Sequence, residues 1–102
     1  MLYELVGIAR CAGSTGGEDA AQLVRLAGRL IVNNRGVVRK IENWGVRPLP
    51  KITNINRQSH VVASHFYVKF DASPSVQSEV MRALRRDPRL LRTTVVKLGG
   101  NR

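Results

Sequence analysis

The segment Gly36–Ile52, GVVRKIENWGVRPLPKI, decides how the rest of the chain is arranged. It begins at a glycine that can end a helix, and it continues through β-branched residues that favour a pleated, half-buried surface. We therefore expect a strand from Val37 to Trp44. Pro48 and Pro50 cannot donate hydrogen bonds to a neighbouring strand, so the second half belongs at a sheet edge, in a bulge or in a loop. The segment predicts one arm of a long hairpin, buried at its start and basic and exposed further on.

Two elements precede this segment. Tyr3–Ala9 is a short, nearly continuous apolar run, which predicts a central strand buried on both faces. Residues 11–17 are rich in glycine and hydroxyl groups and predict a loop. Apolar residues then recur at helical spacing from Ala20 to Ile31 behind an acidic first turn. We expect a helix from about residue 18 to 33, with Gly36 in the left-handed conformation that ends it.

Three elements follow the segment. The polar residues Thr53–Ser59 predict the hairpin tip, and the alternation over His65–Asp71 predicts a strand with two distinct faces. Ser73-Pro74 is a strong helix start, a hydroxyl cap followed by proline, and Pro88 ends that helix. Leu90–Leu98 is rich in β-branched residues and predicts the last strand.

The order strand, helix, strand, strand, helix, strand predicts the α+β class. Two strand-helix-strand halves joined by a hairpin form the ferredoxin-like split βαβ arrangement. Right-handed crossovers place both helices on one face of a four-stranded antiparallel sheet and leave the other face open. With 102 residues the chain suits a single domain over residues 1–102 with one modest core.

The charge of the chain points to a polyanionic partner. Seventeen Lys and Arg oppose seven Asp and Glu, a formal net charge of +10. Most of the basic residues are arginines, whose planar fork suits phosphate oxygens better than a lysine point charge. Nucleic acid is the first candidate and an anionic membrane surface the second. No apolar run approaches the roughly 18 residues that span a bilayer, so we expect no membrane partner.

The residue pattern excludes most chemistry. Cys11 is the only cysteine, so neither an intrachain disulfide nor a cysteine-based metal site can form. His60 and His65 lie near serines, but no third residue has an orienting role, and the seven carboxylates are scattered. The loop before the first helix is rich in glycine, but it lacks the phosphate-loop patterns, and Glu18 and Asp19 would repel phosphate there. We expect no enzyme, no metal, no cofactor and no small-molecule substrate.

Two groups of basic residues are the candidate RNA-binding sites. Phosphate and shape recognition of folded RNA is the expected mode, since the sheet aromatics are too few for stacking on single-stranded bases. One group covers the end of the second helix and the last strand: Arg82, Arg85, Arg86, Arg89, Arg92 and Lys97. The other follows the hairpin: Arg47, Lys51 and Arg57.

Four motifs in this order resemble the small-subunit ribosomal protein six family of bacterial type over nearly the whole chain. They are YELVGIA, GVVRKIENWG-x-R-x-L, FYVKFDASPSVQSEV and RRDPRLLRTTVVK. The resemblance implies a ferredoxin-like structural protein of the small ribosomal subunit, without chemistry of its own. It implies binding to the central domain of the small-subunit ribosomal RNA together with ribosomal protein eighteen. The alternatives are a free-standing basic RNA- or DNA-binding regulatory module and, more remotely, an acylphosphatase-like enzyme.

Departures from the family pattern indicate which branch the chain belongs to. Bacterial members tend to be acidic or near neutral, whereas this chain carries +10 and stops soon after its last predicted strand. We therefore expect the mitochondrial branch and a role in mitochondrial translation, with the bacterial cytoplasm as the alternative. The first ten residues already alternate like a strand, so a targeting signal would be uncleaved. Leu49-Pro50-Lys51-Ile52 lacks the tyrosine that the family usually carries there, and His65 replaces a common aromatic residue.

Trp44, the only tryptophan, has two interpretations. It can anchor the strand in the core, or it can lie on the open sheet face or edge and contact the protein partner. The alternation Val38, Lys40, Glu42, Trp44 places charged neighbours on its side and favours exposure, unless a bulge near Ile41 changes the register. An aromatic residue beside arginine and proline also suits the centre of an interface.

Overall fold

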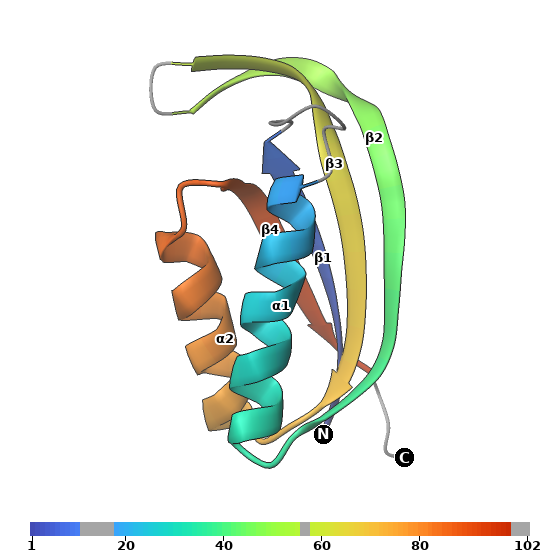
Figure 1. The fold of residues 1–102 in the computed structure, drawn as a ribbon, viewed down its shortest axis with the longest axis vertical. Coiled ribbons are helices and arrows are strands. Elements are labelled where there is room, and N and C mark those ends of the chain that lie inside the picture. The colour runs from blue at the N-terminus through green and yellow to red at the C-terminus, as the bar shows by residue number, and fades with distance from the viewer. Residues whose placement is uncertain (11–17, 56–57, 99–102) are drawn as a thin grey trace.

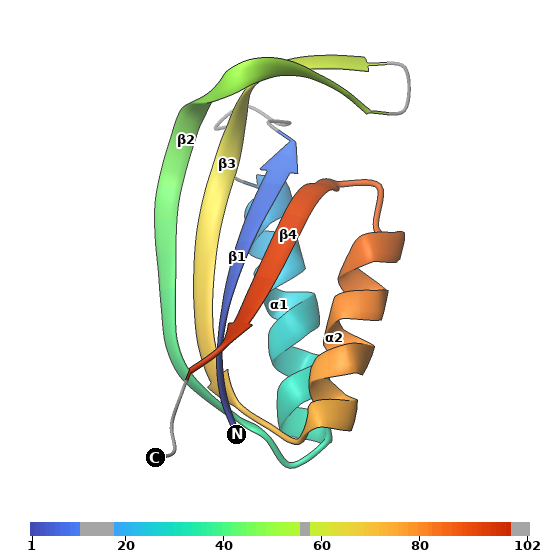
Figure 2. The same cartoon turned by 180° about the vertical axis from the view of Figure 1, so that it is seen from behind.

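The computed structural model describes residues 1–10, 18–55 and 58–98, and the side chains within 1–10, 18–48 and 62–98. The four strands form one antiparallel sheet in the order β2-β3-β1-β4. Both helices lie side by side on the same face of this sheet (Figure 1), and the view from behind shows the other face uncovered (Figure 2). This is the predicted ferredoxin-like arrangement. The elements are β1 Leu2–Arg10, α1 Glu18–Asn33, β2 Val37–Ile55, β3 Gln58–Asp71, α2 Pro74–Arg86 and β4 Leu90–Lys97.

The core lies between the sheet and the helices. Alternate residues of β1 and β3 and one stripe of each helix are buried, among them Leu5, Leu23, Ile31, Phe66, Phe70, Val80 and Leu84. The expectation that β1 is buried on both faces was wrong. Burial alternates along the strand, and Val6 and Ile8 are only half-buried, because both helices cover the same side. The apolar character of that second side therefore belongs to a surface.

The end of α1 differs from the prediction in one residue. The amide of Gly36 donates to the Ile31 carbonyl (2.7 Å) and that of Arg35 to the Val32 carbonyl (3.1 Å), the bond pattern of a Schellman motif. The left-handed residue is Arg35, with φ 68°, and not Gly36. Gly36 is required for space instead, since a Cβ there would lie 2.6 Å from the Ile31 side chain and 2.9 Å from the Asp71 carbonyl oxygen.

The hairpin is longer than predicted. Thr53–Ile55 and Gln58–Ser59 lie in strands, with Thr53 opposite His60, and not in the hairpin tip. Polar residues can continue a ladder here because the pairing uses backbone groups and the arm extends past the end of β1 (Figure 1). The two prolines of β2 lie at a sheet edge, as predicted, and the register shifts between Pro48 and Thr53.

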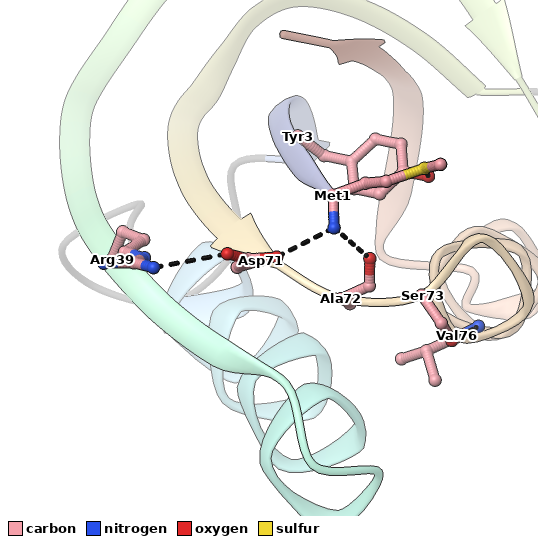
Figure 3. Close-up of polar contacts among 7 residues, drawn as sticks. All are labelled: Met1, Tyr3, Arg39, Asp71, Ala72, Ser73 and Val76. Atoms are coloured by element: carbon pink, nitrogen blue, oxygen red, sulfur yellow. Dashed lines mark hydrogen bonds and ion pairs between the residues drawn. The ribbon is translucent and has the colours of Figure 1, made fainter. Parts of the chain in front are cut away.

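The start of β1 ties three strands together (Figure 3). The Met1 ammonium donates to Asp71 Oδ1 (2.9 Å) and to the Ala72 carbonyl (3.1 Å), and Arg39 Nη2 lies 3.2 Å from Asp71 Oδ2. Ala72 and Ser73 connect β3 to α2. Ser73 Oγ caps the first turn of α2 by accepting a hydrogen bond from the Val76 amide (3.3 Å). The predicted Ser-Pro helix start is confirmed.

Candidate RNA and protein interface

A bulge in β2 sets the position of Trp44. Asn43 lies opposite Phe66 and Gly45 opposite His65, so Trp44 is an extra residue between them. Gly45 has φ 80°, a left-handed conformation that glycine adopts at little cost, and its amide donates to Asn43 Oδ1 (2.8 Å). The Trp-Gly pair in the sequence is therefore the mark of a bulge.

Trp44 lies half-buried on the open sheet face. Its ring stacks on Tyr67 of β3 with centroids 5.5 Å apart and an interplanar angle of 15°. Its Nε1 donates to Glu42 Oε1 (3.1 Å), and the guanidinium of Arg47 lies over the ring, 5.5 Å from its centroid. Trp44 is absent from the core of buried residues, which excludes the core interpretation. Another bulge between Val38 and Lys40 makes Lys40, Glu42 and Trp44 share one face while Val38 packs against the core.

The acidic residues around this aromatic pair are held by hydrogen bonds. The Tyr67 hydroxyl donates to Glu4 on β1, and this bond, with desolvation, raises the pKa of Tyr67 to about 12. The hydrogen bond from Trp44 lowers the pKa of Glu42, and Lys40, whose Nζ lies 3.2 Å from Glu42 Oε2, lowers it further. Both carboxylates are thus engaged within the sheet face.

The open face continues as an apolar strip across the sheet. Strand registers place Val6 of β1 between Tyr67 on β3 and Thr94 on β4, and Val96 of β4 is 54% exposed. Aromatic and aliphatic groups next to fixed polar atoms suit the centre of a protein interface.

The arginines at the end of α2 surround a hollow at the opposite sheet edge. A hollow of about 460 Å³ between α2 and β4 is lined by Arg82, Arg85 and Arg86, beside Met81 and Val95. A second hollow, of about 310 Å³, continues it along β4 from Arg85 to Arg92. The four arginines that line the two hollows are exposed and make no ion pair or hydrogen bond with another described residue. Such free guanidinium groups suit phosphate oxygens.

Two other members of the sequence cluster lie apart from these four. Arg89 Nε donates to Asp87 Oδ1 (2.8 Å), and its Nη2 also binds that carboxylate. This pair lowers the pKa of Asp87 and raises that of Arg89. Lys97 is exposed at the far end of β4, opposite Tyr3.

The hairpin group is only partly described. Arg47 lies on Trp44 in β2, the edge strand opposite β4. The side chain of Lys51, and Arg57 altogether, lie outside the described residues, as does Cys11. The structure therefore places Arg47 at one edge of the sheet and the arginines of α2 and β4 at the other.

The sequence did not predict that Trp44 stacks on Tyr67, nor that Tyr67 binds Glu4. Tyr67 and Glu4 are 63 residues apart, and only the pairing of β1 with β3 brings them together. The alternation over His65–Asp71 predicted which residues share a strand face with Tyr67, but it did not indicate which residues of other strands lie next to it.

Within the described ranges, no group of three or more His, Cys, Asp or Glu could hold a metal ion. No helix in the same part of the chain is long and apolar enough to cross a membrane.

Comparisons with known proteins agree with this geometry. The family model described as ribosomal protein S6 matches residues 2–97. The small ribosomal subunit protein bS6m of Neurospora crassa is 42% identical over 99 residues, covering 97% of this chain and 82% of the relative. Its counterpart in Bos taurus is 38% identical over 80 residues, which cover 78% of this chain and 64% of the relative. The crystal structure of 30S ribosomal protein S6 from Thermotoga maritima superposes with a TM-score of 0.73 at 20% identity, covering 93% of this chain and 84% of that one.

Proposed function

Because the chain belongs to the ribosomal protein S6 family, we propose that it binds the central domain of the small-subunit ribosomal RNA together with ribosomal protein eighteen and so supports mitochondrial translation. The family consists of structural proteins of the small ribosomal subunit, so the chain is not an enzyme. Its localisation is mitochondrial, since relatives in Neurospora and cattle are the mitochondrial form of the protein. The domain 1–102 acts as one unit in this proposal.

The observation that carries the proposal is the row of four arginines around the α2–β4 hollows, none of which has a partner among the described residues. Each ion pair with a phosphate releases condensed counterions, which makes such a surface attractive to RNA and sensitive to salt. Arg47 adds a charge at the other edge, and we include Lys51, Arg57 and Lys97 from the sequence.

The open sheet face supports the second half of the proposal. Trp44 and Tyr67 form a preorganised aromatic pair next to an apolar strip, and nothing in the chain covers them among the described residues. We assign this face to ribosomal protein eighteen, with Trp44 at its centre.

Sedimentation tests the proposal. Tagged protein from mitochondria should migrate with the small subunit at moderate salt, and the pair Arg85→Gln/Arg86→Gln should shift part of it to free fractions. The same gradient distinguishes the ribosomal role from that of a free-standing regulatory module, which would not migrate with the subunit. A pool that stays wholly free of the subunit would refute the ribosomal role.

A further inference from the structure

The outer face of α1 carries a polar stripe that the proposed function leaves unused. Gln22, Arg25, Arg29 and Asn33 recur at three- and four-residue intervals and are all exposed. The opposite stripe of α1 packs against the sheet at Leu23, Ala27 and Ile31, so the polar stripe faces away from it. Helix α2 lies beside α1 on the same face of the sheet (Figure 1).

The two arginines of this stripe have no partner among the residues that the structure describes. They are four residues apart on one helix face, and like charges at this spacing destabilise a helix. The acidic residues of α1 are both in its first turn, where Asp19 accepts a 2.8 Å hydrogen bond from Arg10. Neither Arg25 nor Arg29 makes an ion pair or hydrogen bond with another described residue.

Gly28, between these arginines, is the second observation. Three other glycines have a reason within the fold: a Cβ at Gly7 would meet the Phe66 ring, Gly36 is crowded, and Gly45 has a positive φ. At Gly28 a Cβ would meet nothing within 4 Å, and the backbone is helical. Glycine inside a helix is unfavourable relative to alanine. The described part of the fold therefore gives no reason for glycine at this position, and the missing side chain leaves the helix backbone open to a close approach from outside.

We propose that the outer face of α1 is a second RNA-binding surface, on which Arg25 and Arg29 contact phosphates and Gly28 lets the phosphodiester backbone approach the helix. This inference rests on the proposed RNA-binding function and extends its surface from α2 to α1. A phosphate backbone fits better than an acidic protein segment because the net charge of +10 favours a polyanionic partner. The open sheet face already offers the apolar area that a protein neighbour requires.

Binding of a fluorescent transcript of the rRNA central domain tests the charges. The full chain with ribosomal protein eighteen is titrated at several KCl concentrations. Arg25→Gln/Arg29→Gln should reduce the log–log salt slope by roughly 1.4 to 1.8, since each lost phosphate contact contributes about 0.7 to 0.9. Arg35→Gln/Arg39→Gln removes the same charge from two exposed residues around the start of β2, outside both proposed interfaces, and should leave the slope unchanged.

Gly28 supplies a readout that a merely structural role would not give. Gly28→Ala should raise the melting temperature of the free protein by roughly 4 °C and yet weaken RNA binding several-fold. Gly28→Leu, with a larger side chain, should weaken binding further. Wild-type affinity in both variants would refute the close approach.

Three further outcomes separate the possibilities. If the wild type shows no salt-dependent binding, the proposed function fails together with this inference. If Arg85→Gln/Arg86→Gln lowers the slope and Arg25→Gln/Arg29→Gln does not, only the assignment of α1 is wrong. If the α1 variant loses subunit association with an unchanged slope, the stripe contacts a protein neighbour and the proposal is overturned.

Discussion

At the scale of single residues, Trp44 shows how a local backbone feature creates a surface. The positive φ of Gly45 allows one extra residue in β2, and the resulting bulge places Trp44 over Tyr67. Without the bulge, the strict alternation of a strand would carry the residues beyond it to the opposite faces. Gly45 therefore sets the faces of the residues that follow Trp44, and it is required for its positive φ, since a Cβ there would meet nothing within 4 Å.

Replacing Trp44 distinguishes surface from core. We expect Trp44→Ala to cost about 1 to 2 kcal/mol in the free energy of unfolding, from the lost ring stacking and partial burial. Binding to ribosomal protein eighteen should fall much more, and a pull-down with urea denaturation in parallel measures both. Phe66→Ala, in the core, should cost about 3 to 5 kcal/mol. If Trp44→Ala is as destabilising as Phe66→Ala, the interface assignment loses its support.

At the scale of elements, the lower end of the sheet is held by one carboxylate. Asp71 ends β3 and binds the Met1 ammonium at the start of β1 and Arg39 near the start of β2 (Figure 3). The hydrogen bond from the Met1 ammonium lowers the pKa of Asp71, and Arg39 lowers it further. One side chain thus joins three strands.

The acid stability of the protein should depend on this group. A carboxyl whose pKa is lower in the folded state stabilises the fold above its unfolded pKa, near 3.8, and loses that contribution as pH falls through its folded pKa. Asp71→Asn should therefore lower the melting temperature at neutral pH and flatten its decline below pH 4. Thermal unfolding across pH measures this, with the exposed Glu79→Gln as control. Parallel acid profiles for Asp71→Asn and the wild type would contradict it.

Across the whole molecule, some basic side chains stabilise the fold through ion pairs, and others are available to a binding partner. Arg89 serves the fold through Asp87, whereas Arg82, Arg85 and Arg86 on α2 make no ion pair or hydrogen bond with another described residue. Sequence clustering cannot make this distinction, because neighbouring residues at a helix end point in different directions.

This division predicts opposite effects for neighbouring arginines. Arg85→Gln/Arg86→Gln should reduce the salt slope of RNA binding by roughly 1.4 to 1.8 and leave the unfolding free energy within about 0.5 kcal/mol. Arg89→Gln should leave the slope unchanged and cost about 1 to 2 kcal/mol, because Asp87 loses its charged partner. Salt titrations and urea denaturation measure the two quantities. A reduced slope in Arg89→Gln would place that residue on RNA.

Local patterns were sufficient for the elements and their order. The spacing of apolar residues predicted α1 at its observed bounds, and Ser73-Pro74 predicted the start of α2. These features depend on neighbours within one or two helical turns. The tip of the hairpin was predicted at the right place but too long, because strand pairing at Thr53–Ile55 and Gln58–Ser59 uses backbone groups that composition does not describe.

Fold class, family and the excess of positive charge could be predicted without the structure. Each of these depends on local periodicity, motif order or a sum over the chain. The three-dimensional arrangement was needed to learn which described charges lack a partner and which surfaces are covered. Strand pairing joined Glu4 to Tyr67 and placed Trp44 of β2 over Tyr67 of β3. These contacts depend on register and on residues far apart in the chain, and local sequence patterns contain neither.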